Sequence, residues 1–173
     1  SSTVFEDKLR KTLRKSTGMD LPRLPGAARE ARSACSISSN NTLLLAGDAT
    51  KQAFVEALCS RHWDIVHIAV HAFYSEQGDE GALVFFPNGD NILTTKEIEN
   101  LHFDVDTVVL SACGSALGKM SWTEGSVGFI DAFLRSGSKS VYATLWNIRD
   151  DSTAAFMEKV YACTEIERAK GIT

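Results

Sequence analysis

The chain has 173 residues, 44% of them hydrophobic and 23% charged, and a formal net charge of −4 from 18 basic and 22 acidic residues. This length and balance are typical of one globular domain that buries a core without disulfides or a metal. The weak acidic bias argues against a dedicated nucleic-acid-binding protein, which usually carries a basic patch. No segment reaches the ~18 consecutive apolar residues of a membrane-spanning helix. The charged N-terminus also lacks the apolar core of a secretory signal.

The four cysteines are Cys35, Cys59, Cys113 and Cys163, and no two of them form a C-x-x-C pair. A zinc site therefore has little support, and we expect neither a metal nor a cofactor. Without a secretion signal, reduced thiols in a cytoplasmic protein are the natural expectation.

The first forty residues predict helices separated by a loop. Residues 1–17 indicate a basic, weakly amphipathic helix. The segment LPRLPG (21–26) holds two prolines and a glycine, which is typical of a loop or linker. Residues 27–34 predict a short helix, and 36–41 a polar turn.

From residue 42 onward, apolar runs alternate with helical patterns. We expect strands at 42–46 (TLLLA), 64–70, 82–86, 106–111 and 140–146, and helices at 49–59, 94–101, 125–136 and 151–170. Three local signals support the boundaries: Asp48 as an N-cap, Thr94 or Thr95 as another, and Gly137 as a helix stop. Asn88-Gly89 is a hairpin signal after the strand at 82–86. Continuous apolar strands alternating with helices predict an α/β three-layer αβα sandwich with a mainly parallel central sheet.

Two reactive side chains each follow a strand of this predicted sheet. His71 comes just after the strand at 64–70, and Cys113 just after the strand at 106–111. Chemistry in open α/β sheets collects at the carboxyl ends of the strands. If the two strands are neighbours, the imidazole can act as the base that a thiol needs to become a thiolate at neutral pH.

A glycine after the cysteine favours an oxyanion hole at the same edge. Gly114 permits a tight turn that leaves backbone N–H groups free, and the N–H groups of Cys113 and Ala72 are the natural donors. We therefore assign a candidate oxyanion hole to Ala72, Cys113 and Gly114.

Simpler interpretations of these residues remain open. A lone cysteine at a strand end is more often a small buried apolar residue, and a lone histidine there is more often a hydrogen-bonded structural group. His67 lies four residues before His71, so on a continuous strand both point to the same face, and we interpret His67 as structural or supporting. His62 and His102 fall beside loops and receive no role.

Five segments in order resemble the CHAT domain family. They are LPGAAREA (24–31), LLLAGDATKQAF (43–54), VHIAVHA (66–72), VVLSACGSA (108–116) and the long stretch from EGSVGF to DDST (124–153). CHAT domains belong with caspases, separase and gingipains, so the resemblance implies a caspase-haemoglobinase-like fold. It also implies a Cys–His dyad formed by Cys113 and His71.

The family usually has Gly where this chain has Ala72, and it usually continues with a further strand after the last helix. We expect an N-terminal helix and linker at 1–23 and a CHAT peptidase domain at 24–173, with that final strand missing or supplied from elsewhere.

The same resemblance suggests where a substrate side chain binds. In relatives the pocket surrounds the nucleophile strand and the next strand, which here means Ser111, Thr144, Trp146 and Asp150. An acidic Asp150 in the pocket would favour Lys or Arg before the scissile bond. Helix N-capping by Asp150 or Asp151 is the competing interpretation. The acidic segment 73–81 is long enough to act as a lid or substrate wall.

Three functions are compatible with these features. The first is a cysteine endopeptidase acting on a protein or peptide substrate, with no direct nucleic-acid or membrane partner. The resemblance implies control by a tetratricopeptide-repeat (TPR) or other sensor domain or a regulatory subunit, as in bacterial defence systems that cleave a gasdermin. The second is a catalytically silent CHAT scaffold for protein–protein interaction. The third, an unrelated α/β hydrolase or thiol transferase, is disfavoured because the chain has no G-x-S-x-G motif and its His precedes its Cys.

Overall fold

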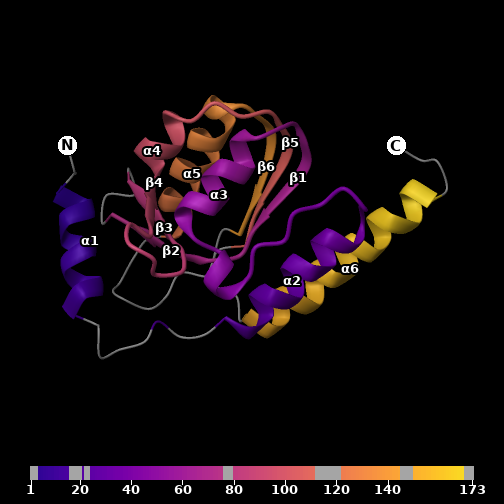
Figure 1. Cartoon of the computed structure of the whole chain (residues 1–173), viewed down its shortest axis with the longest axis horizontal. Coiled ribbons are helices and arrows are strands. Elements are labelled where there is room, and N and C mark those ends of the chain that lie inside the picture. Colours follow the sequence, from indigo (N-terminus) through magenta and orange to yellow (C-terminus); the bar gives the residue numbers. More distant parts are fainter. Residues whose placement is uncertain are drawn as a thin grey trace.

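A computed structural model of the chain describes residues 4–15, 21, 24–75, 80–111, 122–144 and 150–169. Two small sheets lie among helices (Figure 1). The elements in chain order are α1 (Val4–Lys15), α2 (Pro25–Ser36), a 3₁₀ turn (Ala46–Asp48), α3 (Lys51–Cys59), β1 (Trp63–Ile68), β2 (His71–Tyr74), β3 (Gly81–Val84), β4 (Ile92–Thr94), α4 (Thr95–Glu99), β5 (Val105–Leu110), α5 (Trp122–Ser136), β6 (Ser138–Ala143) and α6 (Asp150–Ala169). The predicted mixture of helices and parallel strands is confirmed.

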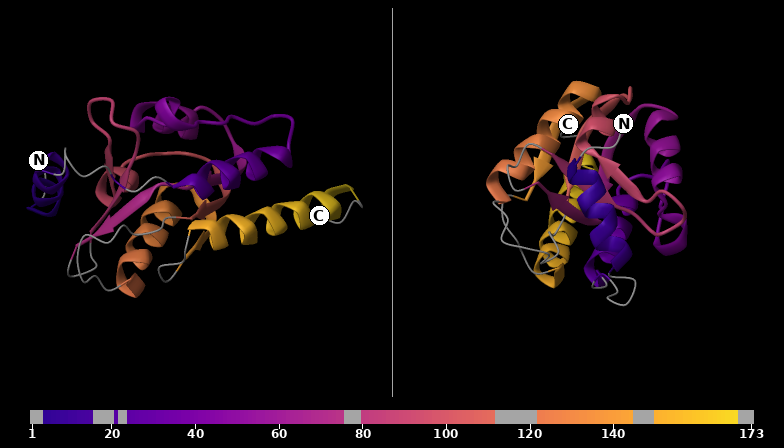
Figure 2. Two further views of the ribbon diagram at one scale, coloured as in Figure 1. Left: turned by 90° about the horizontal axis from the view of Figure 1, so that it is seen from below. Right: turned by 90° about the vertical axis from the view of Figure 1, so that its left-hand side faces the viewer.

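The first sheet is parallel and has the order β1-β5-β6. Ile68 of β1 joins the core that Phe129 and Phe133 of α5 fill from one face. His67, its neighbour on β1, contacts α2 and α6 on the other face. Helices α2 and α6 pack side by side (Figures 1 and 2). Helices therefore cover both faces of this sheet, as the continuous apolar strands predict.

The second sheet is antiparallel and has the order β2-β3-β4, which the sequence analysis did not anticipate. The predicted hairpin is confirmed, because β3 and β4 are antiparallel and Gly89 takes a φ of 75° in the turn between them. The interpretation of 73–81 as a lid is wrong for Phe73 and Tyr74, which are buried in β2. A four-residue buried strand does not stand out in an acidic, glycine-containing segment. Residues 76–79 lie outside the described part of the chain.

The strand expected at 42–46 is not formed. The segment is extended up to Leu45, with φ −132° and ψ 147°, and then turns into the 3₁₀ helix that begins at Ala46. It pairs with no strand among the described residues. Apolar content and extended backbone predict a strand, but a strand also needs a neighbour at hydrogen-bonding distance, and that neighbour is not encoded locally.

Local signals at helix ends were more reliable, with one exception. Thr94 caps α4 in a capping box with Glu97, and Gly137 ends α5 with a φ of 127°. A Cβ at position 137 would lie 1.8 Å from the carbonyl oxygen of Phe103, so only glycine fits. The expected cap Asp48 is wrong: Thr50 caps α3 by accepting a hydrogen bond from the N–H of Ala53, because the 3₁₀ turn delays the helix start.

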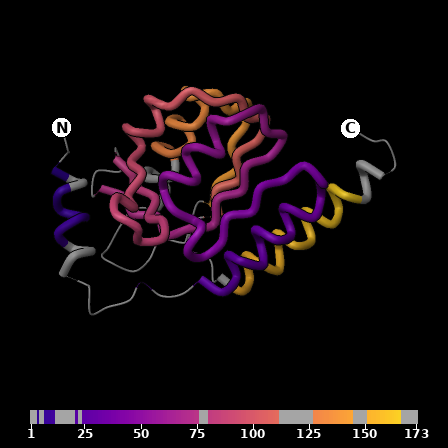
Figure 3. Tube along the Cα trace, viewed as in Figure 1, coloured from indigo at the N-terminus to yellow at the C-terminus, as the bar shows by residue number. Residues whose placement is uncertain are grey.

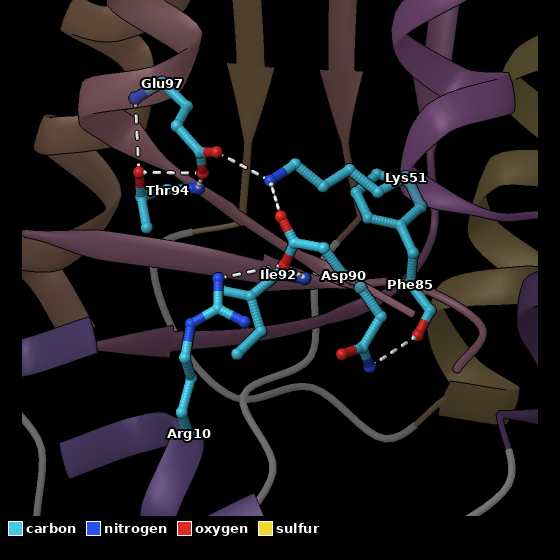
Figure 4. A network of polar contacts seen from close by, with 8 residues as sticks. Arg10, Lys51, Phe85, Asp90, Ile92, Thr94 and Glu97 are labelled. Atoms are coloured by element: carbon cyan, nitrogen blue, oxygen red, sulfur yellow. Dashed lines mark hydrogen bonds and ion pairs between the residues drawn. The ribbon is translucent and has the colours of Figure 1, made fainter. Parts of the chain in front are cut away.

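A network of charges surrounds the antiparallel sheet (Figure 4). Asp90, in the β3–β4 turn, accepts hydrogen bonds from Arg10 of α1 at 2.9 Å and from Lys51 of α3 at 2.6 Å. Lys51 also donates to Glu97 of α4 at 2.6 Å. Leu9 of α1 is buried against this sheet. Three helices are thus connected to the sheet that carries His71.

Candidate functional site

His71 lies where the two sheets meet. It is the first residue of β2 and pairs with Val84 of β3, while β1 ends three residues earlier at Ile68. The expected strand at 64–70 is therefore shorter, and His71 belongs to the antiparallel sheet. Because His67 and His71 are not on one continuous strand, the argument that they share a face does not apply. The Nδ1 atom of His71 is buried.

Ser111 connects the end of β5 to the end of β1. Its N–H donates a hydrogen bond to the carbonyl oxygen of Ile68 at 2.9 Å. The side chain is buried, and its Oγ has no hydrogen-bond partner among the described residues. A buried hydroxyl without a partner is costly in a folded protein and so calls for a functional or bound partner. Ser111 also lies two positions before Cys113 in sequence.

The backbone N–H of Ala72 points away from the β2–β3 ladder. Ser75 donates to the carbonyl of Glu80 at 2.8 Å, and bonded pairs alternate along an antiparallel ladder. The bonded pairs are therefore Phe73 with Ala82 and His71 with Val84, while Ala72 opposite Leu83 is a non-bonded pair. Ala72 has no positive φ. Alanine in place of the family's glycine thus imposes no left-handed strain, and its N–H remains directed out of this ladder.

The remaining predicted site residues are described only in part. Cys113, Gly114 and Trp146 lie outside the described residues. Thr144 directly follows β6 and is half-buried, and Asp150 is the first residue of α6, with its side chain outside the description. The structure therefore connects Ser111, after β5, to Ile68 at the end of β1, three residues before His71. The rest of the predicted pocket stays a prediction.

A buried polar cluster next to the site was missed by sequence reasoning. The Nε2 of His67 lies 3.2 Å from Oε2 of Glu30, and the two side chains are 3% and 2% exposed. The two atoms are close but lack hydrogen-bond geometry. The Nδ1 of His67 is 2.7 Å from the hydroxyl of Tyr161, whose pKa is raised above its usual value by burial and by the nearby Glu30 carboxyl. The cluster joins α2, β1 and α6.

The other described cysteines have no site around them. Cys35, Cys59 and Cys163 are free thiols on α2, α3 and α6, the last two exposed. Burial raises the pKa of Cys35, which keeps it a thiol at neutral pH.

A group of charged side chains lies at the amino-terminal ends of β1 and β5, away from the strand ends near His71. His62 lies 3.0 Å from Asp104, 3.5 Å from Asp64 and 3.7 Å from Asp106. These groups are solvent-exposed, and Asp106 also accepts a hydrogen bond from Lys139, which lowers the pKa of its carboxyl. Exposed carboxylates around a histidine are common surface features, and we assign them no role in the site.

Comparison with protein families decides the classification. A model of the CHAT domain matches residues 3–166. The chain belongs to the CHAT domain family. This family is related to caspase-like peptidases. Searches of curated proteins and of solved structures gave no match.

The CHAT motifs meet in space around β1. Glu30, from the motif at 24–31, contacts His67 from the motif at 66–72. Ser111, from the motif at 108–116, is hydrogen-bonded to Ile68 of that same central motif. Within the described helices of this CHAT domain, none combines the length and apolar character needed to cross a bilayer.

Proposed function

We propose that this CHAT domain is a cysteine endopeptidase in which Cys113 is the nucleophile and His71 its acid/base partner. The hydrogen bond from Ser111 N–H to Ile68 is the observation that carries the proposal. Two residues of chain span at most ~7 Å, which limits how far Cys113 can lie from Ser111. His71 follows Ile68 by three residues. The two reactive groups therefore leave the sheet from strand ends that are bonded to each other.

The proposed reaction is acyl transfer from a peptide bond to the thiol and then to water. His71 takes the thiol proton, and the sulfur of Cys113 attacks the carbonyl carbon. The C–N bond breaks as the imidazolium gives its proton to the leaving amine, and a thioester remains. His71 then deprotonates a water that attacks the thioester, which releases the acid and restores the thiol.

The outward N–H of Ala72 supports an oxyanion hole at this edge. An oxyanion hole needs backbone N–H groups that secondary structure does not consume and that are held rigidly. Ala72 is 1% exposed and fixed in β2, yet its N–H faces away from β3. We propose it as one donor, together with the N–H groups of Cys113 and Gly114.

The substrate pocket is proposed to use the buried hydroxyl of Ser111 with Thr144, Trp146 and Asp150. Ser111 Oγ offers an unused hydrogen-bonding group beside the proposed nucleophile. An acidic Asp150 would select Lys or Arg immediately before the scissile bond. A peptide library with basic, acidic and apolar residues at that position tests this preference: the Asp150→Asn variant is expected to lose the discrimination.

Covalent labelling tests the nucleophile directly. The protein is incubated with peptidyl acyloxymethyl ketones that carry Lys, Asp or Leu next to the warhead, and the labelled residue is located by mass spectrometry. Labelling of Cys113 that falls at least about a hundredfold in His71→Ala supports the dyad. His102→Ala is the matched control, since His102 is exposed and outside the site.

The same experiment separates the peptidase from a catalytically silent CHAT scaffold. A scaffold would show slow labelling of Cys113 that does not depend on His71, or preferential labelling of the exposed Cys59 and Cys163. Either result would remove the peptidase proposal. Control of the activity by a sensor domain or regulatory subunit is a further part of this proposal, suggested by the family resemblance.

A further inference from the structure

An apolar groove of about 930 Å³ runs beside β1, on the side away from β5. Its floor and sides come from α2, the extended segment after it, α3 and the end of β3. Asp64 is the only carboxylate among the residues that line it. A cavity of this size could hold either a small apolar ligand or a piece of polypeptide.

The pattern of lining residues favours polypeptide. All nine consecutive residues 63–71 line the groove on one side, and all seven consecutive residues 40–46 line it on the other. The face of a strand presents only every second residue, whereas its edge presents them all. Two backbone edges therefore face each other across this space, which we call the edge slot.

Both edges of the slot have unused backbone positions. Among the described strands β1 pairs only with β5, so its other side has no strand neighbour there. Residues 42–45 join no sheet, Leu45 has an extended backbone, and no backbone hydrogen bond within the described part of the chain links this segment to β1. The tube in Figure 3 shows this segment following the course of β1 at a distance. An extended segment that is followed by a helix and a parallel strand can accommodate a further strand between the two.

The outer edge is held at both ends, so it cannot simply swing inward. At one end, Asn41 donates from its side chain to the carbonyls of Cys35 at 2.9 Å and Ser38 at 2.6 Å. At the other end, Phe86 N–H donates to the carbonyl of Ala49 at 3.0 Å. A strand inserted between the walls keeps all of these bonds.

The walls are less buried than the core positions of β5. Ile65, Val66 and the leucines at 43–45 are only half-buried, while Val105 and Val108 of β5 are fully buried. Interior strands of a parallel sheet are covered on both faces and both edges. The side chains of the slot are therefore apolar like those of an interior strand, but no strand among the described residues lies between the two walls.

We propose that the edge slot receives an extended β-strand from a partner protein, inserted parallel to β1. Strands of about five residues are typical, so the segment is a run of about five apolar residues. Parallel insertion places the start of this run beside Asp64, at the beginning of β1. Because Asp64 is the only carboxylate in the lining, a Lys or Arg just before the apolar run complements it. Strand addition of this kind draws affinity from main-chain hydrogen bonds and specificity from side-chain pockets.

A synthetic strand tests the proposal without any assumption about peptidase activity. The probe is a fluorescein-labelled peptide, Arg-Val-Leu-Val-Val-Thr, with a solubilising polyethylene glycol tail, and binding is followed by fluorescence anisotropy. One control peptide has Pro at the third position, which removes a ladder donor, and a second has Glu in place of Arg. We expect both changes to weaken binding at least about tenfold.

Matched protein variants locate the binding. Leu44→Glu places a charge in the outer wall of the slot, and Val127→Glu makes the same kind of change on the exposed surface of α5. Leu44→Glu is expected to reduce affinity about tenfold or more, and Val127→Glu to leave it unchanged. Asp64→Asn is expected to remove the preference for Arg over Glu. Hydrogen exchange should slow at residues 42–45 and 63–68 when the Arg peptide is bound.

Other results would overturn the proposal. Binding that tolerates the central Pro, with no added exchange protection at 42–45 and 63–68, would indicate a pocket for small apolar molecules. Concentration-dependent dimerisation that protects the same amides without peptide would make a second copy of the chain the occupant. Absence of both binding and protection at millimolar peptide would exclude strand addition. Each result concerns binding, so it leaves the cysteine chemistry to be judged by covalent labelling.

Discussion

The two sheets of the molecule are stabilised in different ways. The parallel sheet lies between helices, and His67 of β1 lies in a buried polar cluster with Glu30 of α2 and Tyr161 of α6. The antiparallel sheet is surrounded by charges at its margin, where Asp90 and Lys51 connect it to helices. Removing one partner of a buried polar pair is strongly destabilising, whereas exposed ion pairs contribute little free energy. The strands of the antiparallel sheet are themselves almost entirely buried, so we infer that the two sheets differ in their polar contacts and not in the depth of their packing.

This difference separates effects on stability from effects on activity. Variants in the parallel sheet should lower the free energy of unfolding of the whole domain. Variants at the edge of the antiparallel sheet should alter the proposed chemistry, or the position of His71, at small cost to folding. The predictions below use this separation, starting with the largest expected effect.

The largest effect is expected at His67. His67→Phe leaves the Glu30 carboxyl buried without its partner, and we expect the free energy of unfolding to fall by about 3–5 kcal/mol. Denaturant unfolding measures it. The double variant Glu30→Met with His67→Phe should recover most of the loss, because an apolar pair needs no partner. Glu158→Gln, which breaks only the exposed pair with Arg29, is the control. An equal loss in the control, or no recovery in the double variant, would contradict the assigned role.

Replacing single backbone amides by esters tests the antiparallel sheet. An ester at position 72 removes the N–H that points away from the ladder, and we expect kcat/KM for peptide cleavage to fall about 100-fold or more. An ester at position 73 removes an N–H that bonds to β3. It should cost about 1 kcal/mol of stability and leave kcat/KM nearly unchanged. Equal kinetic losses at both positions would show that the alternation inferred for this ladder, or the role of Ala72, is wrong.

A substitution at Gly81 tests how tightly the antiparallel sheet packs against Phe129 of α5. A Cβ at this position would lie 2.6 Å from the ring of Phe129, which is fully buried and also meets Tyr74 edge-on at 5.4 Å. Gly81→Ala should therefore cost about 1–3 kcal/mol of stability. Gly47→Ala is the matched control, because the nearest atom there is 4.0 Å away and ordinary contact costs little. A smaller loss at 81 than at 47 would mean that the Phe129 ring can move.

Local patterns in the sequence predicted the elements that depend on local contacts. Thr94 and Gly137 act through the capping bond and the close backbone approach at their own positions. The segment at 42–46 has the apolar composition of a strand, but its pairing depends on a distant strand, so the prediction failed. The antiparallel sheet was missed for the same reason, because β2 is only four residues long and is recognisable as a strand only by its pairing with β3.

The site was predicted in outline because it depends on strand ends. His71 and Cys113 were identified from the rule that chemistry gathers at the carboxyl ends of parallel strands, and Ser111 from the CHAT resemblance; the structure shows that the ends of β1 and β5 are bonded together. Glu30 was missed because a glutamate on a short helix normally faces water. Its position in the motif at 24–31, with His67 in the motif at 66–72, was the signal that could have paired them. Cys113 lies outside the described residues, so its part of the site stays a prediction.

The smallest effect is expected at Asp90. Burial alone would raise the pKa of its carboxyl, but the hydrogen bonds from Lys51 and Arg10 outweigh burial and hold that pKa below its usual value. A lowered pKa in the folded state means that the stabilisation is present above about pH 4 and disappears as the pH falls through the folded pKa. Asp90→Asn should therefore reduce stability by less than about 1 kcal/mol at pH 7 and by progressively less toward pH 3.

Thermal unfolding at several pH and salt values measures this effect, with Asp131→Asn on α5 as the control for an exposed pair away from the sheet. High salt should shrink the difference for both variants. Only Asp90→Asn should also increase hydrogen exchange in β3 and β4, because Asp90 connects the turn between them to α1 and α3, whereas Asp131 pairs within α5. Unchanged exchange there would mean that the antiparallel sheet holds its position without the charges. The buried packing of Leu9 and Phe129 would then be what fixes His71, and the contrast between the two sheets would be one of degree.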